Sequence, residues 1–180
     1  MGHREQATLS VPVTRSDHLE GGEKASVTLV EYGDYECPYC GQAYKLLKAI
    51  QREMDHRLLF VFRNFPLTGS HPFAETAAEA AESAGVQGKF WEMHDFLYEN
   101  QDRLGQDLIV EAASTLSLDV ERLINDIRVR RYKDRVRQDF MGGVHSGVNG
   151  TPCFFINDAR FEGNWASGEL AVTLKRLARP

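Results

Sequence analysis

The feature that most constrains the fold is a strand that runs directly into two closely spaced cysteines at the start of a helix. Val27–Gly33 is β-branched and aromatic, as in a buried strand. Asp34-Tyr-Glu-Cys-Pro-Tyr-Cys40 follows at once. Apolar residues then recur at helical spacing, at Ala43, Leu46, Leu47, Ile50 and Met54. Pro38 suits a first helical position because its missing N–H would have no partner there. The pattern therefore predicts a strand-to-helix turn with Cys37 at the helix start.

The remaining chain predicts a second strand, a block of helices and a short hairpin. Leu58–Phe65 is expected as a strand parallel to the first, because a helix connects them. Between Pro72 and about Phe140 the periodicity is helical only. The expected helices cover Ala74–Ala84, the segment around Phe90–Tyr98, Leu108–Leu116 and Val120–Phe140. Gly142, Gly143 and Gly147–Gly150 are expected to break the helices.

The order of elements predicts an α/β fold of the form β-α-β, inserted helical block, β-β-α. Two short strands, Cys153–Asn157 and Arg160–Glu162, are joined by a turn at Asn157-Asp158, and Gly168–Arg179 closes the chain as a helix. Asp17–Gly22 is expected as a loop. We expect one domain over residues 1–180, with a core of about 26–70 and 142–180 and a helical insertion of about 71–141.

Composition narrows the function only slightly. The 180 residues, 42% of them hydrophobic, suffice for one core. With 21 Lys and Arg against 26 Asp and Glu, the net charge of −5 argues against a nucleic-acid partner. Residues 1–10 lack the apolar segment of a secretory signal, and no stretch approaches the roughly 18 apolar residues of a membrane span. We expect a cytoplasmic monomer without a membrane partner; a processed extracytoplasmic chain would look similar.

Three cysteines are too few for a disulfide scaffold, so they require redox chemistry, a metal or packing as an explanation. Cys37 and Cys40 are neighbours on one helical turn, close enough for a disulfide. The helix N-terminus favours a thiolate on Cys37, which makes it the expected nucleophile and Cys40 the resolving thiol. The alternative is half of a zinc site completed by Cys153 and His145.

Several spaced motifs agree with one known family. They are Glu36-Cys-Pro-Tyr-Cys-Gly41, Phe65-Pro-Leu67, His71-Pro72, Gln87-Gly-Lys-Phe-Trp-Glu-Met-His94 and Gly147-Val-Asn-Gly-Thr-Pro152. Over roughly residues 26–177 the chain resembles the DsbA-like thiol oxidoreductases, which are thioredoxin-like folds with a helical insertion. The resemblance implies electron exchange with protein or peptide thiols and disulfides through Cys37 and Cys40, without a cofactor or a resident metal.

The resemblance also assigns roles to residues outside the cysteine pair. Thr151-Pro152 matches the loop whose cis-proline faces the pair and whose backbone binds a polypeptide, and Pro38 and Tyr39 would contact the same substrate. Glu31 matches a buried carboxyl beneath the disulfide, where it would accept or donate a proton for Cys40. A carboxylate paired with a basic group, or one that reaches solvent, is an equal alternative.

Two departures from the family pattern bear on the chemistry. Strongly oxidising members carry His at the position of Tyr39, which cannot supply a positive charge, and Glu36 adds a negative one. We therefore expect a milder oxidant, or even a reductant. Cys153 follows Pro152 where the family more often has no thiol; it is either a third redox thiol or, as we favour, a small buried hydrophobe.

The histidines and a basic stretch have plainer interpretations than catalysis. His71, His94 and His145 could act as acids or bases, but none has a metal-ligand spacing, and packed or hydrogen-bonded side chains are favoured. The basic stretch from Arg128 to Arg137 is expected to form a solvated helix face.

The leading prediction is thus an enzyme, a protein-disulfide oxidoreductase that works through a mixed disulfide. Its recycling partner, whether thioredoxin, glutathione or a membrane oxidase, stays open. Two non-enzymatic alternatives are a redox sensor whose disulfide changes partner affinity and a zinc-binding structural protein using Cys37, Cys40 and Cys153.

Overall fold

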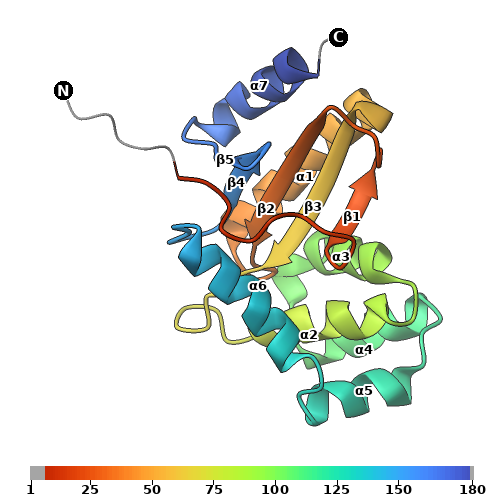
Figure 1. The fold of residues 1–180 in the computed structure, drawn as a ribbon. Helices are drawn as coiled ribbons and strands as arrows, with labels where there is room; N and C mark the ends of the chain where they lie inside the picture. The colour runs from red at the N-terminus through yellow and green to blue at the C-terminus, as the bar shows by residue number, and fades with distance from the viewer. Residues whose placement is uncertain (1–6, 179–180) are drawn as a thin grey trace. The chain divides into compact units, whose positions relative to one another are not determined.

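The computed structural model describes residues 7–178 (Figure 1). The contacts within this part of the chain divide it into two compact units. The first comprises residues 7–32, 42–63 and 141–178, and the second comprises 33–41 and 64–140. The first unit holds the β-sheet, and the second holds the cysteine turn and most of the helices. The expected domain boundaries stay predictions.

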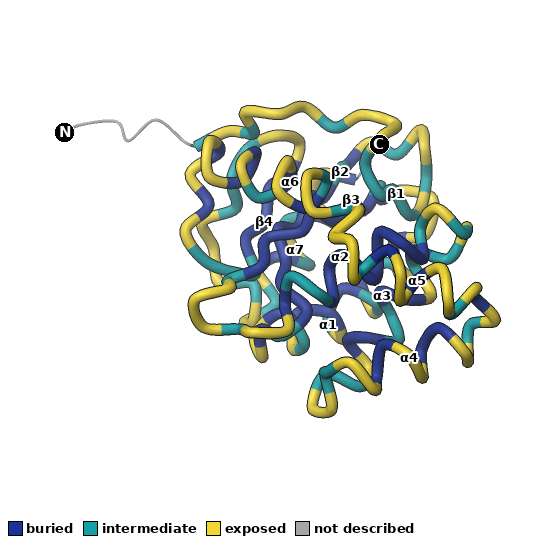
Figure 2. Tube along the Cα trace, turned by 90° about the horizontal axis from the view of Figure 1, so that it is seen from below, coloured by how far each residue is buried: buried dark blue, intermediate teal, exposed yellow. Residues whose placement is uncertain are grey.

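The first unit is built on a sheet that, within the described residues, has the strand order β1-β3-β2-β4-β5. The strands are β1 His18–Gly21, β2 Val27–Gly33, β3 Leu58–Asn64, β4 Cys153–Ile156 and β5 Ala159–Arg160. The pairs β1–β3, β2–β4 and β4–β5 are antiparallel. Figure 2 shows β2 and β3 dark blue along most of their length, and all but one residue of each is buried. Their mostly apolar sequences agree with burial on both faces.

The helices divide between the units. α1 Pro38–Met54 and α6 Lys133–His145 run from one unit into the other, and α7 Glu169–Leu177 belongs to the first. The second unit contains α2 Ala74–Gly85, α3 Phe90–Glu99, α4 Gln106–Thr115 and α5 Val120–Arg128. Single-turn helices lie at η1 Asp55–Arg57, η2 Gln101–Arg103 and η3 Trp165–Ser167. α2 packs against α3, α4 and α5, and its buried alanines allow these helices to approach closely.

The expected loop at Asp17–Gly22 was wrong, because β1 is a strand. It pairs with β3 from His18 opposite Phe62 to Gly21 opposite Leu59. The strand lies at the edge of the sheet and is largely polar, so its hydrogen bonds to β3, rather than an apolar pattern of its own, define it.

The single helix expected over Val120–Phe140 was also wrong. The chain breaks between α5 and α6, and Arg130 adopts a left-handed φ of 54° there. Its guanidinium pairs with Glu75 at 2.8 Å and with buried Glu79 at 2.6 Å, both on α2. Tertiary ion pairs therefore stabilise a turn that helical periodicity does not reveal, and part of the basic stretch is not a free solvated face.

Gly142 and Gly143 were expected to end a helix, but this was wrong, because α6 continues through both of them to His145. A Cβ on Gly142 would lie 3.3 Å from Val11 and 3.5 Å from the Tyr32 hydroxyl. This glycine thus permits close packing within a helix. The turn at Asn157-Asp158 is confirmed, with φ values of 46° and 70° and strands on either side.

A buried arginine anchors the N-terminal segment of the first unit. Arg63 on β3 binds the two carboxylate oxygens of Asp17 at 2.8 and 3.2 Å and donates to the carbonyls of Val11 and Pro12 and to the Tyr32 hydroxyl. Burial alone would lower the pKa of Arg63, but the hydrogen bonds to Asp17 and Tyr32 raise it above its ordinary value. The guanidinium therefore stays charged and ties residues 11–17 to the sheet.

Candidate active site

The two cysteines of the redox motif lie at the start of α1, as predicted. Pro38 is the first helical residue, so Cys37 directly precedes the helix and Cys40 lies in its first turn. Cys37 is 4% and Cys40 0% exposed, whereas Tyr39 between them is 62% exposed. An approaching molecule thus meets an aromatic ring beside two recessed sulfurs.

The turn before the cysteines is held by a buried carboxylate. Asp34, 1% exposed, accepts hydrogen bonds from the backbone N–H of Glu36 at 2.7 Å and of Leu67 at 2.8 Å. Its backbone carbonyl accepts from the Cys37 N–H at 3.2 Å. Asp34 therefore joins the cysteine turn to a segment more than thirty residues later in the chain.

The same carboxylate holds a histidine. The His71 Nδ1 atom lies 2.8 Å from Asp34 Oδ2, and the imidazole is 18% exposed. Burial alone would lower the pKa of His71, but the hydrogen bond and charge of Asp34, with smaller contributions from Cys37 and Glu36, raise it. Asp34 thus favours an imidazolium in electrostatic reach of Cys37.

Glu36 is tied to the same later segment. Its Oε2 atom accepts a hydrogen bond of 2.6 Å from the backbone N–H of Phe73. The negative charge that the sequence places beside Cys37 is therefore directed at a backbone donor just before α2.

Gln101 is a site residue that the sequence analysis missed. Its Nε2 atom donates to the carbonyl oxygens of Tyr35 and Cys37, both at 2.8 Å. A Cβ on Gly41 would overlap Gln101 Oε1, so the glycine after Cys40 makes room for this amide. Gln101 lies in η2, 64 residues after Cys37, and no local pattern marks it.

An aromatic cluster packs around Tyr35, in the turn before the cysteines. The buried Tyr35 hydroxyl lies 3.1 Å from His94 Nδ1, and its ring lies 5.0 Å from that of Tyr98. Trp91 packs edge-on against His94 at 5.2 Å. The expectation of hydrogen-bonded histidines is confirmed for His71 and His94. The motif Gln87–His94 thus contributes packing around Tyr35.

The other predicted site residues belong to the first unit. Glu31 is buried on β2 and pairs with Phe154 on β4, while the next residue, Tyr32, pairs with Cys153. The Thr151–Pro152 peptide bond is cis and immediately precedes β4. Their predicted roles in proton transfer and polypeptide binding stay predictions.

Cys153 is buried, with 6% exposure. Burial raises the pKa of its thiol, although Arg160 opposes the shift. Because the thiolate is the reactive form, this environment disfavours reaction at Cys153. Burial also agrees with the favoured interpretation as a small hydrophobe.

Among residues 7–178, no three or more His, Cys, Asp or Glu side chains gather so that they would hold a metal ion. In the same range, no helix combines the length and the apolar character needed to cross a membrane.

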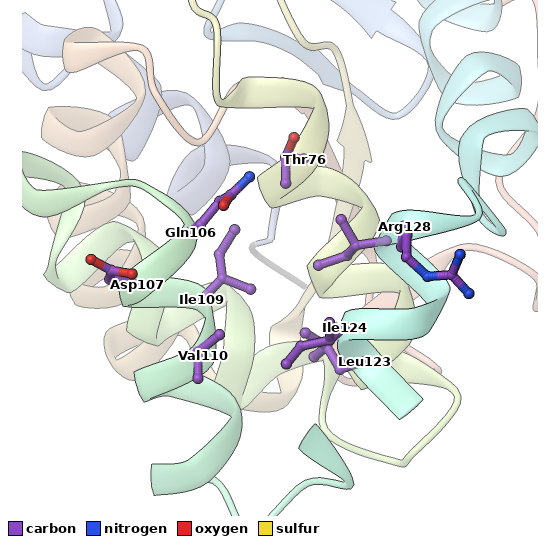
Figure 3. Close-up of a pocket in the computed structure, with 9 residues that line it drawn as sticks. Thr76, Gln106, Asp107, Ile109, Val110, Leu123, Ile124 and Arg128 are labelled. Atoms are coloured by element: carbon purple, nitrogen blue, oxygen red, sulfur yellow. The ribbon is translucent and has the colours of Figure 1, made fainter. Parts of the chain in front are cut away.

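The helices of the second unit enclose a hollow that contains none of the predicted site residues. It has a volume of about 440 Å³ and lies between α2, α4 and α5 (Figure 3). Its wall is formed mostly by Ile109, Val110, Leu123, Ile124 and Ile127, with polar groups of Thr76, Gln106, Asp107 and Arg128. It is therefore an apolar feature of the helical packing.

Comparison with known proteins identifies the family. The model of a family described as Thioredoxin matches residues 14–176, so the chain belongs to the thioredoxin family. The chain is similar to oxidised BdbD from Bacillus subtilis, with a TM-score of 0.83 and 24% identity over 97% of this chain and 100% of the other. It is also similar to alpha-DsbA1 from Wolbachia pipientis, with a TM-score of 0.80 and 19% identity over 94% of each chain. The predicted thioredoxin-like α/β fold and the resemblance to DsbA-like proteins are confirmed.

Another solved structure, with a higher sequence identity and a lower TM-score, carries a broader description. A thioredoxin-like oxidoreductase from Silicibacter pomeroyi is 27% identical, with a TM-score of 0.73, over 91% of this chain and 94% of the other. That neighbour is described as an oxidoreductase, and its likeness to this chain extends over most of both chains.

The curated relatives are longer proteins. The chain is 44% identical over 158 residues to the Na⁺/H⁺ antiporter NhaA 1 of Salinispora arenicola, a match that covers 87% of this chain and 24% of the relative. A second relative, the Na⁺/H⁺ antiporter NhaA 1 of Mycobacterium sp. strain KMS, is 40% identical over 171 residues, which cover 93% of this chain and 28% of the relative. The chain therefore spans about a quarter of the length of these relatives.

Proposed function

We propose that this protein is a protein-disulfide oxidoreductase in which Cys37 and Cys40 alternate between a dithiol and a disulfide. The observation that carries the proposal is the placement of the pair at the start of α1, with the turn before it fixed by Asp34 and Gln101. A helix N-terminus stabilises a thiolate, which is the reactive form of cysteine. A thiolate is needed to attack a disulfide, and a second thiol one helical turn away can then resolve the mixed disulfide.

The reaction proceeds through a mixed disulfide. In substrate reduction, the Cys37 thiolate attacks one sulfur of a substrate disulfide, the substrate S–S bond breaks, and the second sulfur leaves as a thiolate. Cys40 loses its proton and attacks the Cys37 sulfur, which releases the first substrate sulfur as a thiolate. Two electrons pass to the substrate, and the pair becomes a disulfide. Substrate oxidation follows these steps in reverse.

The remaining predicted residues receive supporting roles in this proposal. Glu31 exchanges the proton of Cys40, and its burial supports this role because a buried carboxyl exchanges protons closer to neutral pH. Pro38, Tyr39, Thr151 and Pro152 bind the substrate polypeptide. Cys153 takes no part in exchange, since the burial that raises the pKa of its thiol also limits its reactivity.

We propose that the protein works as a monomer in the cytoplasm, where it reduces or repairs oxidised thiols. Glutathione and thioredoxin keep cytoplasmic thiols reduced, so an oxidant of proteins has little substrate there. Either of these two reductants would then recycle the pair. An extracytoplasmic protein would instead transfer electrons from substrates to a membrane oxidase. Trapping the Cys37 redox state in intact cells distinguishes these directions of electron flow.

The test is equilibration of the full chain in graded glutathione buffers, followed by alkylation and intact-mass analysis. We expect a reversible two-electron couple that is lost in Cys37→Ser and Cys40→Ser and retained in Cys153→Ser. Its potential sets the direction: about −120 mV indicates an oxidant and about −270 mV a reductant. A wild-type chain without a couple, or a couple lost in Cys153→Ser, would overturn the proposal.

Two alternatives are separated by simple measurements. Catalytic insulin reduction by the wild type but not by Cys37→Ser excludes a redox sensor without turnover. Stoichiometric zinc that is lost in the cysteine variants would instead support the zinc-binding structural protein. The ion exchange named for the longer relatives is not part of the proposal, since the cysteine pair supports thiol chemistry.

A further inference from the structure

The tyrosine between the cysteines leaves the redox motif without a cation of its own, but the fold brings a histidine to the same turn. His71 is separated from Cys37 by 34 residues in sequence. Asp34 connects them, since its carboxylate binds His71 Nδ1 at 2.8 Å and its carbonyl accepts from the Cys37 N–H at 3.2 Å. His71 is therefore two hydrogen bonds from the backbone of the expected nucleophile.

The surroundings favour the charged form of this histidine. The groups that act on it electrostatically are Asp34, Cys37 and Glu36, all of which are acidic. Asp34 is fully buried within its network, whereas His71 retains 18% exposure and can exchange a proton with solvent. Glu36 is directed to the Phe73 N–H, so Asp34 is the carboxylate in direct contact with the imidazole.

We propose that His71, held in place by Asp34, is the cation of the redox site and stabilises the Cys37 thiolate when it is protonated. This inference rests on the proposed function and assigns to a residue outside the motif the charge that the motif lacks. A stabilised thiolate makes the reduced pair more stable and the disulfide more oxidising. The effect weakens as the pH rises and His71 loses its proton, at a pKa that the hydrogen bond to Asp34 holds above the ordinary value for histidine.

The test compares charge with structure at position 71. His71→Gln keeps hydrogen-bonding capacity without charge, and His71→Lys keeps a cation without the imidazole. His56→Gln is a matched control, because His56 Nδ1 also lies 3.0 Å from an aspartate, Asp55, but at a site 82% exposed in the first unit. Two readouts are the iodoacetamide alkylation rate of Cys37 between pH 4 and 9, followed by peptide mass, and the equilibrium with glutathione.

We expect His71→Gln to lower Cys37 alkylation at pH 6 by roughly three- to tenfold and to shift the glutathione equilibrium toward the protein disulfide by a similar factor, below the full effect of a directly contacting charge. His71→Lys should stay within about twofold of the wild type at pH 7, as should His56→Gln. The reactivity difference between wild type and His71→Gln should shrink above neutral pH. Thermal unfolding of each variant verifies that the fold persists.

Two results would overturn this inference. One is unchanged reactivity and equilibrium in His71→Gln. The other is an equal loss in His71→Gln and His71→Lys, which would show that the hydrogen bond to Asp34, and not the charge, matters. If the wild-type protein shows no redox couple with glutathione, the proposed function is contradicted. The pH profile of Cys37 alkylation would still decide whether His71 stabilises the thiolate.

Discussion

Each unit of the molecule contains a buried charged side chain that binds distant chain segments, Arg63 in the first and Asp34 in the second, and the two differ in what they bind. Arg63 in the first unit binds Asp17 and the carbonyls of Val11 and Pro12. Asp34 in the second binds two backbone N–H groups and His71. Both bind distant chain segments, but only Asp34 binds a side chain, His71, that loses its charge as the pH rises.

The difference separates stability from reactivity. An arginine–aspartate pair is fixed in charge near neutral pH, so it holds the N-terminal segment without responding to conditions. In the aspartate–histidine pair, His71 loses its positive charge as the pH rises, so the charge of a group bound to the segment before Cys37 depends on pH. Loss of the Arg63–Asp17 pair should therefore change the free energy of unfolding, whereas loss of the Asp34–His71 pair should also change the reactivity of Cys37.

The largest expected effect is on stability when Arg63 is replaced by Met. The change leaves Asp17, whose side chain is 7% exposed, as a buried carboxylate without its ion-pair partner, bound only by local donors such as the Thr14 N–H at 2.7 Å. We expect a loss of about 3–5 kcal/mol in the free energy of unfolding, measured with urea, and an unchanged glutathione equilibrium. Lys175→Met is the control, because its ion pair with Glu53 is partly exposed and should contribute at most about 1 kcal/mol. A changed glutathione equilibrium in Arg63→Met would contradict the prediction, since Arg63 would then affect thiol chemistry as Asp34 does.

Asp34→Asn should have the second-largest effect and act on both properties. Replacement of the carboxylate weakens charge-assisted hydrogen bonds, so we expect a loss of about 1.5–3 kcal/mol in unfolding free energy. Removal of the negative charge also lowers the pKa of His71, so alkylation of Cys37 should slow at pH 6. Urea unfolding and alkylation rates measured on one preparation test this pair of effects. If Asp34→Asn lowers the free energy of unfolding but leaves the alkylation rate of Cys37 unchanged, Asp34 has a structural role only, like that expected for Arg63.

Gln101→Ala should have a smaller effect. Two hydrogen bonds from a neutral, partly buried amide to the backbone carbonyls of Tyr35 and Cys37 are lost, so we expect a loss of about 1 kcal/mol in the free energy of unfolding. Mixed-disulfide resolution should slow because the first turn of α1 is less well fixed, as measured by stopped-flow reaction with a peptide disulfide. Gln106→Ala on α4 is the control and should leave the rate unchanged. Equal rates for the two variants would rule out a positioning role for Gln101.

The smallest effect should be the pH dependence of unfolding that His71 provides. Because the pKa of folded His71 lies above its ordinary 6.5, the stabilisation by its pair with Asp34 is fully present below about pH 6.5. It is lost as the pH rises through the higher folded value. Urea unfolding from pH 5.5 to 8.5 should therefore show a decline that His71→Gln lacks. An identical decline in both proteins would assign it to other groups.

The sequence predicted the parts of the site that are local. Strand, cysteine pair and helix are contiguous, so hydrophobic spacing and Pro38 sufficed to place Cys37 at the start of α1. Asp34, His71 and Gln101 come together only in the folded chain, across separations that no periodicity encodes. The sequence therefore predicted a motif without a cation, whereas the structure places one beside it.

The errors in the fold have the same cause. Polar β1 exists because β3 offers hydrogen-bonding groups at an edge, and the turn at Arg130 exists because α2 offers Glu75 and Glu79. Gly142 lies within a helix because Val11 and Tyr32 approach it. In each case a distant segment determines the local structure, while the sequence pattern reports only the local preference.

The unequal exposure of the redox motif has a consequence for kinetics. Tyr39 is 62% exposed, but Cys37 only 4%, so little of the Cys37 surface is open to a reactant. We expect small disulfides to react with less hindrance than a folded protein, which must present its disulfide on a protruding or unfolded segment. The burial of Cys37 would thus make the rate of exchange depend on the size of the disulfide that approaches it.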